Sequence, residues 1–561
     1  MKNKIRKKFF ASTLLSVIAA ACSATTSFAA GPVLPGAGTL IQEVQPQLPQ
    51  NPSTDDTGLT LQPGKTQQSE SDVAFEVKQI VIEGNTQIDT GTLHDLVRTD
   101  EGKSLTLKQL QKDAQRVTEF YRKQGYPLSR AIIPAQTLDS GQVKILVIEA
   151  TYGSFFLNNT SHASNSSINS LLSPLLSGDP IADSSLDRAL LLLSDMPGII
   201  PAASMSPGSH TGSSDLTVNV LPGPRTSGSL TVNNYGNNFT GNGQFGANLM
   251  VNELLGIGDQ LSANGLTTGP GMNYARLGYE FLANGSGTRV GASVSNLQYM
   301  LSDSMSALQG QGTASVTSAW ARQPFIRSQT VNLYGQAEFD YKRLSDQTIT
   351  TLTNRHLDNG VLSLNGDERD GWLSGGVGLM NASWTGGRVN FDNTQALSVD
   401  AHGGLTAGTF GKWTGNMNRL QNLGGERAQL YLSLSGQWAQ KNLDPIEKLV
   451  VGGPYSVRGY DMGVMAADSG VLGTVEGRYK MTEHWQAVVF GDSEHIAINA
   501  NPYMPGPNGA TLSGAGVGAN WTDGGAWSAK IYAASRLGAV PTQLAGSPAG
   551  TLLWGEVNWG F

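Results

Sequence analysis

Cysteine is nearly absent from this chain of 561 residues, and its seven histidines do not cluster. The single cysteine, Cys22, lies in a segment that we expect to be removed, which leaves the mature protein with none. A disulfide framework, cysteine-ligated zinc, an iron–sulfur cluster and thiol catalysis are therefore excluded. The histidines are scattered and form no HExxH spacing.

Charge and long apolar runs are also scarce. Charged residues make up 14% of the chain, against a usual ~25%. The formal net charge of −7 argues against nucleic acid as the main partner. After Cys22 no apolar run approaches the ~18–20 residues that a membrane helix needs. Glycine, by contrast, is abundant at 69 residues.

The first 29 residues have the pattern of a bacterial export signal. Basic residues precede an apolar stretch from Phe9 to about Cys22, and Ser27-Phe28-Ala29 resembles a cleavage site. A lipoprotein signal that uses Cys22 is the alternative, but Ala19 stands where such signals usually carry leucine. The chain is thus predicted to be exported, as a soluble periplasmic protein or as an outer-membrane barrel.

Residues 30–71 are rich in Pro, Gln, Ser and Thr, a composition that predicts a linker. Within it, Gly38–Gln45 has the pattern of a short helix. A helix of this length is not stable alone in water. If the segment is ordered, we expect it to dock on another part of the protein.

Residues 72–150 read as a small α+β domain. A strand pattern around residues 75–82 precedes a short helix near Thr90–Val97. A longer helix, capped by Thr106, and two strands, about Leu128–Ile133 and Gln142–Glu149, complete the pattern. Residues 151–222 look like a weaker copy, with a helix at about residues 184–194 and strands at about 199–205 and 215–221.

From residue 226 to 561, strand-length runs alternate between apolar and polar residues, as in Val331–Lys342 and Gln429–Trp438. The chain ends on such an alternation, with Phe561 last. This ending is typical of the final strand of an outer-membrane barrel, which turns an apolar face to lipid and a polar face to the lumen. A soluble sandwich also has one polar face, but the length of the region, the export signal and the chain end favour a barrel of about 16 strands.

Several sequence signals for enzymes or cofactors fail on inspection. Gly102-Lys103-Ser104 resembles the end of a P-loop, but Val97 stands in place of its first glycine. The glycines of residues 514–518 suit a barrel strand and lack the context of a dinucleotide site. We find no Ser/His/Asp or Asp/His set. The sequence therefore predicts no enzymatic activity and no cofactor.

One connection, of about 31 residues, separates the strands predicted at Gln429–Lys441 and Gly473–Lys480. Loops this long are usually functional or disordered. This one contains Arg458, a strong cation beside the flexible Gly459. Strand parity in Trp485–Glu494 turns Asp492 toward the lumen, so Arg458 and Asp492 either pair or remain two solvated charges that never meet.

The motif Val457-Arg458-Gly459-Tyr460 resembles the VRGY motif of two-partner-secretion transporters, outer-membrane exporters of large haemolysins and filamentous adhesins. Val147-Ile148-Glu149 is similar to part of the first POTRA domain of that family, and Asp195-Met196-Pro197-Gly198 to part of the second. The resemblance runs from about residue 72 to the end and keeps the order of the family's domains.

The resemblance implies that Arg458 pairs with the aspartate of an F-x-D-x-G motif. Phe490 and Asp492 match this motif, whereas Glu494 replaces its glycine. In the family an N-terminal helix can plug the pore, and Gly38–Gln45 is the candidate here.

We therefore predict a mainly β protein, with a 16-stranded transmembrane barrel at residues 226–561 preceded by two small α+β periplasmic POTRA domains. The POTRA domains are expected to bind a large, unfolded secreted exoprotein (an adhesin, cytolysin, toxin or haem-acquisition protein) through its N-terminal secretion domain. The other expected partner is outer-membrane lipid, with no nucleic acid, nucleotide or cofactor. The alternatives are a barrel-assembly insertase, a passive porin and a barrel enzyme.

Overall fold

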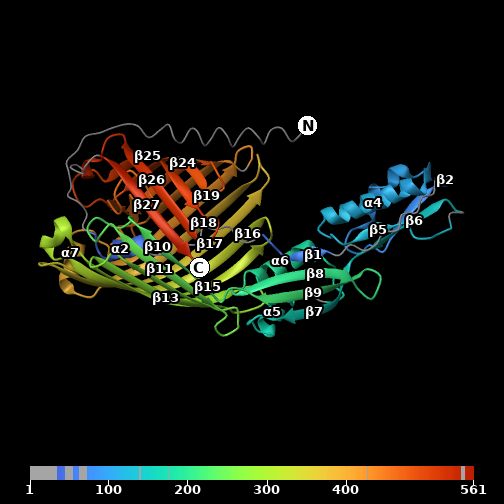
Figure 1. The fold of residues 1–561 in the computed structure, drawn as a ribbon, viewed down its shortest axis with the longest axis horizontal. Helices are drawn as coiled ribbons and strands as arrows, with labels where there is room; N and C mark the ends of the chain where they lie inside the picture. The colour runs from blue at the N-terminus through green and yellow to red at the C-terminus, as the bar shows by residue number, and fades with distance from the viewer. Residues whose placement is uncertain are drawn as a thin grey trace.

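A computed structural model of the chain describes residues 35–44, 55–61, 73–137, 140–175, 177–425, 427–544 and 550–561. The predicted export signal and most of the predicted linker lie outside these residues. No helix in the described part of the chain is long and apolar enough to cross a membrane. Two small α+β units extend from one end of a large barrel (Figure 1).

The first α+β unit contains a three-stranded sheet in the order β3-β6-β5 and a two-stranded sheet, β2-β4. Its elements are β2 (Ala74–Val77), β3 (Gln79–Glu83), α3 (Thr90–Asp95), η1 (Arg98–Asp100), β4 (Lys103–Thr106), α4 (Leu107–Lys123), β5 (Arg130–Ile132) and β6 (Gln142–Ile148). The predicted helix start at Thr106 is confirmed. Thr106 accepts a hydrogen bond from Gln109 N, and the Gln109 side chain accepts one from Thr106 N, which forms a capping box.

The prediction of a single strand around residues 75–82 is wrong. The chain divides at Lys78, whose N–H donates to Gly141 O (2.7 Å). The two halves join different sheets, because β2 pairs with β4, which the sequence did not indicate, and β3 runs parallel to β6.

The second α+β unit is a four-stranded sheet in the order β1-β8-β9-β7 with two helices on one face. Its elements are β1 (Leu59–Leu61), β7 (Thr151–Asn159), α5 (Asn165–Leu172), α6 (Asp183–Ser194), β8 (Ile199–Pro207) and β9 (Ser213–Pro222). The sequence pattern did not indicate β7 and α5. Nor did it indicate β1, which comes from the linker and pairs in parallel with β8.

The described residues of the C-terminal region form a closed barrel of 16 strands, which confirms the predicted fold class. The strands are β10 (Thr226–Asn233), β11 (Gln244–Asn252), β12 (Gln260–Thr267), β13 (Met272–Leu282), β14 (Arg289–Met300), β15 (Gln311–Arg327), β16 (Val331–Gln347), β17 (Leu352–Asp370), β18 (Gly376–Phe391), β19 (Gly408–Asn422), β20 (Ala428–Ala439), β23 (Ser469–Lys480), β24 (Trp485–Ala497), β25 (Gly509–Thr522), β26 (Trp527–Leu537) and β27 (Thr551–Gly560). Strand β27 pairs with β10 and closes the ring.

The predicted two-residue alternation is present in these strands. In β16, Val331 and Phe339 are exposed on the outer face, whereas Asn332 and Asp340 are buried inside. Outward apolar and inward polar side chains are what a barrel in a membrane requires. Three short helical segments lie in connections at the end of the barrel away from the α+β units: η2 (Asp303–Leu308), α7 (Thr394–Ala401) and η4 (Thr542–Leu544).

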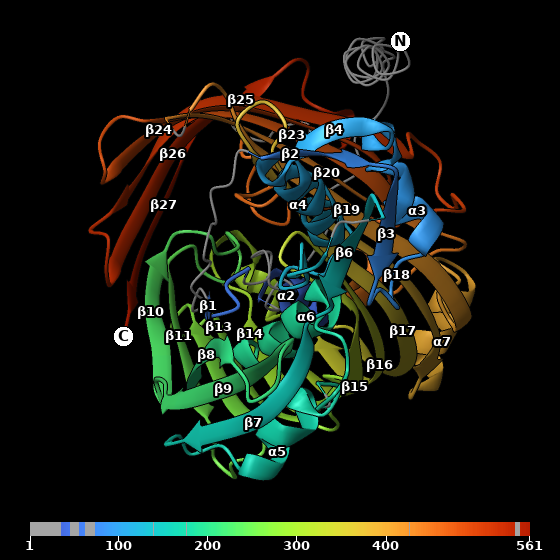
Figure 2. The same ribbon diagram turned by 90° about the vertical axis from the view of Figure 1, so that its right-hand side faces the viewer.

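The long connection, residues 440–468, folds back into the barrel. It contains η3 (Pro445–Glu447) and a hairpin of β21 (Leu449–Val451) with β22 (Met465–Ala467). The helix predicted at Gly38–Gln45 is present as α2 (Ala37–Val44). Seen along the barrel, α2 lies within the ring of strands (Figure 2). Leu40 and Ile41 are fully buried there, against a cluster that includes Tyr299, Val316 and Leu344 of the wall.

Candidate functional site

The tip of the long loop, residues 452–460, is a compact turn inside the barrel. Gly453 N donates to Tyr460 O (2.9 Å), and Tyr460 N donates to Val457 O (3.0 Å). Gly452 and Gly453 have φ of 87° and 93°, a conformation that favours glycine. A Cβ at Gly453 would lie 2.7 Å from the Met462 sulfur. The two glycines therefore allow the sharp reversal that presents the following motif to the wall.

The structure brings Arg458 and Asp492 together. Arg458 Nε donates to Asp492 Oδ2 (2.8 Å) and Nη2 donates to Oδ1 (2.7 Å), so the contact is bidentate. The backbone N–H of Arg458 also donates to Asp492 Oδ2 (3.2 Å). Asp492 points inward from β24, the parity that the sequence predicted, and its side chain is fully buried. A planar, charge-assisted pair of this kind fixes both position and orientation.

A second carboxylate shares the arginine. Arg458 Nη1 contacts Glu476 Oε1 at 2.6 Å, and the other oxygen of Glu476 accepts from Arg478 (2.6 Å). Sequence reasoning did not find Glu476. The alternation of residues along β23 predicts that Glu476 points inward. Its place opposite Phe490 on β24, however, depends on the register of the two strands.

Aromatic rings also contact Arg458. The Phe490 ring centroid is 3.4 Å from the guanidinium carbon, a cation–π contact that desolvation strengthens. Trp554 of β27 donates its indole N–H to the carbonyl of Arg458 (2.8 Å). Phe490 was a predicted site residue, whereas Trp554 was not.

The other predicted motif residues pack the tip against the wall. Val457 and Tyr460 are fully buried in a cluster with Met465, Ile496 and Leu512. Gly459 lies against backbone atoms of β26, and a Cβ there would stand 3.0 Å from Arg536 N. A side chain at position 459 would therefore displace the tip from the wall.

Glu494, which replaces the glycine of the F-x-D-x-G motif, adds a tie to the loop. Ser456 Oγ donates to the Glu494 carboxylate, and it accepts a hydrogen bond from Gly452 N (3.0 Å). Glu494 is buried. The replacement of the motif glycine by Glu494 therefore does not prevent Arg458 from pairing with Asp492.

A cavity of about 1200 Å³ lies between the outer loops and α2. It is bordered by Pro35 and Gly36 before α2, by Val399 of α7 and by Tyr503 in the connection after β24. Within the residues that the structure describes, no group of three or more His, Cys, Asp or Glu side chains is placed to hold a metal ion.

Two family models match the chain. The first, described as haemolysin secretion/activation protein ShlB/FhaC/HecB, matches residues 212–518. The chain belongs to this haemolysin secretion/activation family. The second, described as a POTRA domain of ShlB type, matches residues 75–150. These matches confirm the resemblance found in the sequence.

Members of the family among curated proteins resemble the chain over most of its length. The heme/hemopexin transporter protein HuxB of Haemophilus influenzae (strain 86-028NP) is 26% identical over 521 residues, 90% of this chain and 91% of that protein. The outer membrane transporter CdiB of Escherichia coli O6:K15:H31 (strain 536 / UPEC) is 23% identical over 477 residues, 81% of this chain and 79% of that protein.

Solved structures share the fold. CdiB from Escherichia coli superposes with a TM-score of 0.70 at 20% identity, covering 89% of this chain and 93% of that one. BamA from Haemophilus ducreyi lacking POTRA domains 1–3 superposes with a TM-score of 0.51 at 12% identity, covering 87% and 100%.

Family and fold together give the functional class. The protein is an outer-membrane β-barrel transporter of two-partner secretion, with POTRA domains in the periplasm, and it acts with a large secreted exoprotein that crosses the barrel.

Proposed function

We propose that both α+β units are POTRA domains that bind the N-terminal secretion domain of an unfolded exoprotein and deliver it to the barrel. In this proposal residues 1–29 are the signal peptide, 30–71 the linker with a plug helix, 72–150 and 151–222 the two POTRA domains, and 226–561 the barrel. The observation that carries the proposal is the pair of small α+β units at the entrance of a barrel whose lumen holds an anchored loop.

Sheet edges of the POTRA domains suit an extended substrate. An added strand gains backbone hydrogen bonds that depend little on its sequence. In the first sheet, β3 and β5 are edge strands, and in the second β7 is one. The opposite edge of the second sheet, at β8, is occupied by the chain's own β1, with Leu59 opposite Ala203. A substrate strand at β8 must therefore displace β1.

We further propose roles for two elements in the lumen. The Arg458–Asp492 pair holds the tip of the long loop in its working position, and α2 closes the resting pore. The buried position of α2 among wall residues from several strands supports its role in closing the pore. Transport in this proposal uses no catalysis, nucleotide or cofactor, and folding of the exoprotein outside the cell supplies the drive.

The outer surface of the barrel fits lipid. At the strand ends nearest the POTRA domains, Trp485 lies beside Trp521 and Trp527 beside Trp559, with ring centroids 6.4 and 6.1 Å apart. Toward the other end Trp384, Trp413 and Trp438 are aligned across three strands. Two aromatic bands of this kind mark the interfaces of a membrane, so we propose outer-membrane lipid as the direct neighbour.

The name of the Haemophilus relative makes a heme- or hemopexin-related exoprotein the first cargo to test. The test is secretion by cells that carry the transporter and a candidate exoprotein of this class. Deleting residues 72–222 should stop secretion while the barrel stays heat-modifiable in the outer membrane. Normal secretion from that deletion would sink the proposal.

The main alternative is an assembly factor for outer-membrane proteins, favoured by the fold shared with BamA. Loss of the whole transporter would then lower the amounts of unrelated barrel proteins. We expect those amounts to stay unchanged while the exoprotein remains inside the cell.

A further inference from the structure

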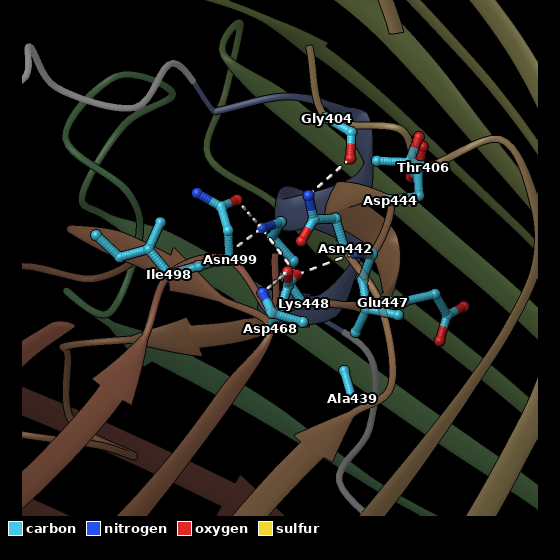
Figure 3. Close-up of polar contacts among 12 residues, drawn as sticks. Gly404, Thr406, Ala439, Asn442, Asp444, Glu447, Lys448, Asp468, Ile498 and Asn499 are labelled. Atoms are coloured by element: carbon cyan, nitrogen blue, oxygen red, sulfur yellow. Dashed lines mark hydrogen bonds and ion pairs between the residues drawn. The ribbon is translucent and has the colours of Figure 1, made fainter. Parts of the chain in front are cut away.

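The first part of the long loop, residues 442–448, here called the near limb, is anchored separately from the tip. Lys448 pairs with Asp468 (2.8 Å), and Asn442 donates to Gly404 O (2.8 Å) (Figure 3). Glu447 points away from the Lys448–Asp468 pair, toward the barrel wall (Figure 3). There Glu447 contacts Lys342 of β16 (2.8 Å) and Lys412 of β19 (2.9 Å).

One arginine links the near limb to the wall and to the plug helix. Arg355 of β17 contacts Asp444 of the near limb through Nε (2.5 Å) and Asp346 of β16 through Nη1 (2.7 Å). The other oxygen of Asp346 accepts the first helical N–H of α2, from Ala37 (2.7 Å), and the Tyr299 hydroxyl (2.8 Å). The Arg355 side chain is only 4% exposed, so its charge is balanced mainly by these two carboxylates.

The near limb also touches α2 directly. Gly38 packs on η3 so closely that a Cβ added there would lie 2.6 Å from Ile446 N. The side-chain amide of Gln42 donates to the Ile446 carbonyl. The helix thus rests on backbone atoms of the near limb, which cannot turn aside as a side chain can.

We propose that Arg355 is a positioning residue for both the near limb and α2, and that the near limb is the seat of the plug. The pore is then closed only while the near limb is docked on Arg355. The tip is held elsewhere, by β23, β24 and β27, so the near limb and α2 leave the wall without breaking the Arg458–Asp492 pair. This inference rests on the proposed role of α2 as a plug.

The seat is tested by Gly38→Ala in the full mature chain, measured by conductance in planar bilayers. Alanine favours helix more than glycine does, so helix propensity alone predicts tighter closure. Docking of α2 on the near limb through Gly38 predicts the opposite, because the added methyl group would push the helix away. Conductance should then rise to the level of a chain lacking residues 35–44. Gly473→Ala, which adds the same methyl group in β23 where nothing lies within 4 Å of it, should leave conductance low. Low conductance from Gly38→Ala would overturn the proposal.

The same measurements separate the two hypotheses. If deletion of residues 35–44 does not raise conductance, the plug itself is wrong. If the deletion raises conductance and Gly38→Ala does not, only the seat is wrong. Because α2 lies outside the sheet, Gly38→Ala does not prevent the barrel from folding.

The role of Arg355 is tested with Arg355→Ala, using Arg419→Ala as a control. Arg419 is also ion-paired on the barrel, with Asp370 (2.8 Å), but it is remote from the near limb. We expect high conductance from Arg355→Ala only. Tyr235→Cys and Tyr455→Cys, whose native ring centroids are 5.7 Å apart, should be joined equally in both backgrounds by a short thiol-reactive cross-linker because the tip stays. Unchanged conductance, or loss of this cross-link with Arg355→Ala, would contradict the proposal.

Discussion

Arg458 is shared by two carboxylates, so the two members of its predicted pair are not equivalent. Without Arg458, both Asp492 and Glu476 lose their central cation, although Glu476 keeps Arg478. Without Asp492, Arg458 still has Glu476. Stranding a buried charge costs roughly 3–5 kcal/mol, and contact with water in the lumen reduces that cost.

We therefore expect Arg458→Ala to lower secretion at least about tenfold relative to the unmodified protein, which corresponds to about 1.4 kcal/mol. Asp492→Ala should lower secretion less than Arg458→Ala does. The double mutant should be no worse than Arg458→Ala, because both changes remove one shared interaction. Arg458→Lys should rescue poorly, since lysine lacks the planar fork that matches a carboxylate. Secreted exoprotein, normalised to heat-modifiable barrel, is the measurement. Defects that multiply in the double mutant would show that the two residues act separately.

Among the helices, α2 is held by contacts that depend on protonation. Glu43 of α2 accepts a hydrogen bond from Asn237 (3.3 Å). Burial raises the pKa of Glu43 to about 8, although this hydrogen bond acts to lower it. In the released helix Glu43 returns to its ordinary pKa of 4.5. The docked form therefore binds the proton more tightly than the released form does.

Docking of α2 should thus be fully favoured below about pH 4.5 and weaken as the pH rises toward 8. Pore conductance in planar bilayers is expected to increase over this range. Glu43→Gln, which stays neutral, should keep conductance low throughout and flatten its pH dependence. A pH dependence that is identical in Glu43→Gln would assign the effect to another group.

At the scale of the whole molecule, charged contacts hold the second α+β unit on the barrel. Asp195, at the end of α6, makes a bidentate contact with Arg327 at the end of β15, with both distances 2.8 Å. The Arg327 side chain is fully buried. Arg188 of α6 also donates to the carbonyl of Pro324 (2.8 Å). These contacts hold the unit against the end of β15.

Arg327→Ala should let the second α+β unit move relative to the barrel, because Asp195 then loses its bidentate partner. We expect faster proteolysis between residues 222 and 226 and a severalfold loss of secretion, with the barrel still heat-modifiable. Arg98→Ala removes an exposed pair with Asp95, which contributes little, and serves as the control. Equal proteolysis of the two variants would refute a fixed orientation.

Features that depend on neighbouring residues in the chain could be predicted from the sequence alone. The two-residue alternation of β24 placed Asp492 in the lumen, and Thr106 as a cap marked the start of α4. The helix pattern at residues 38–45 located α2 to within one residue. Each of these follows from local backbone geometry and side-chain chemistry, so no distant partner is needed to predict it.

Which distant groups meet could not be predicted in this way, because it depends on how the whole chain folds. Glu476 joins Arg458 because β23 and β24 pair in one register, and Asp444 reaches Arg355 because the long loop folds inward. Strand β1 exists only because β8 offers it an edge; three residues have no stable extended structure alone. These contacts join residues separated by about 18 to 144 positions, and loop closure and packing over such distances depend on the whole fold.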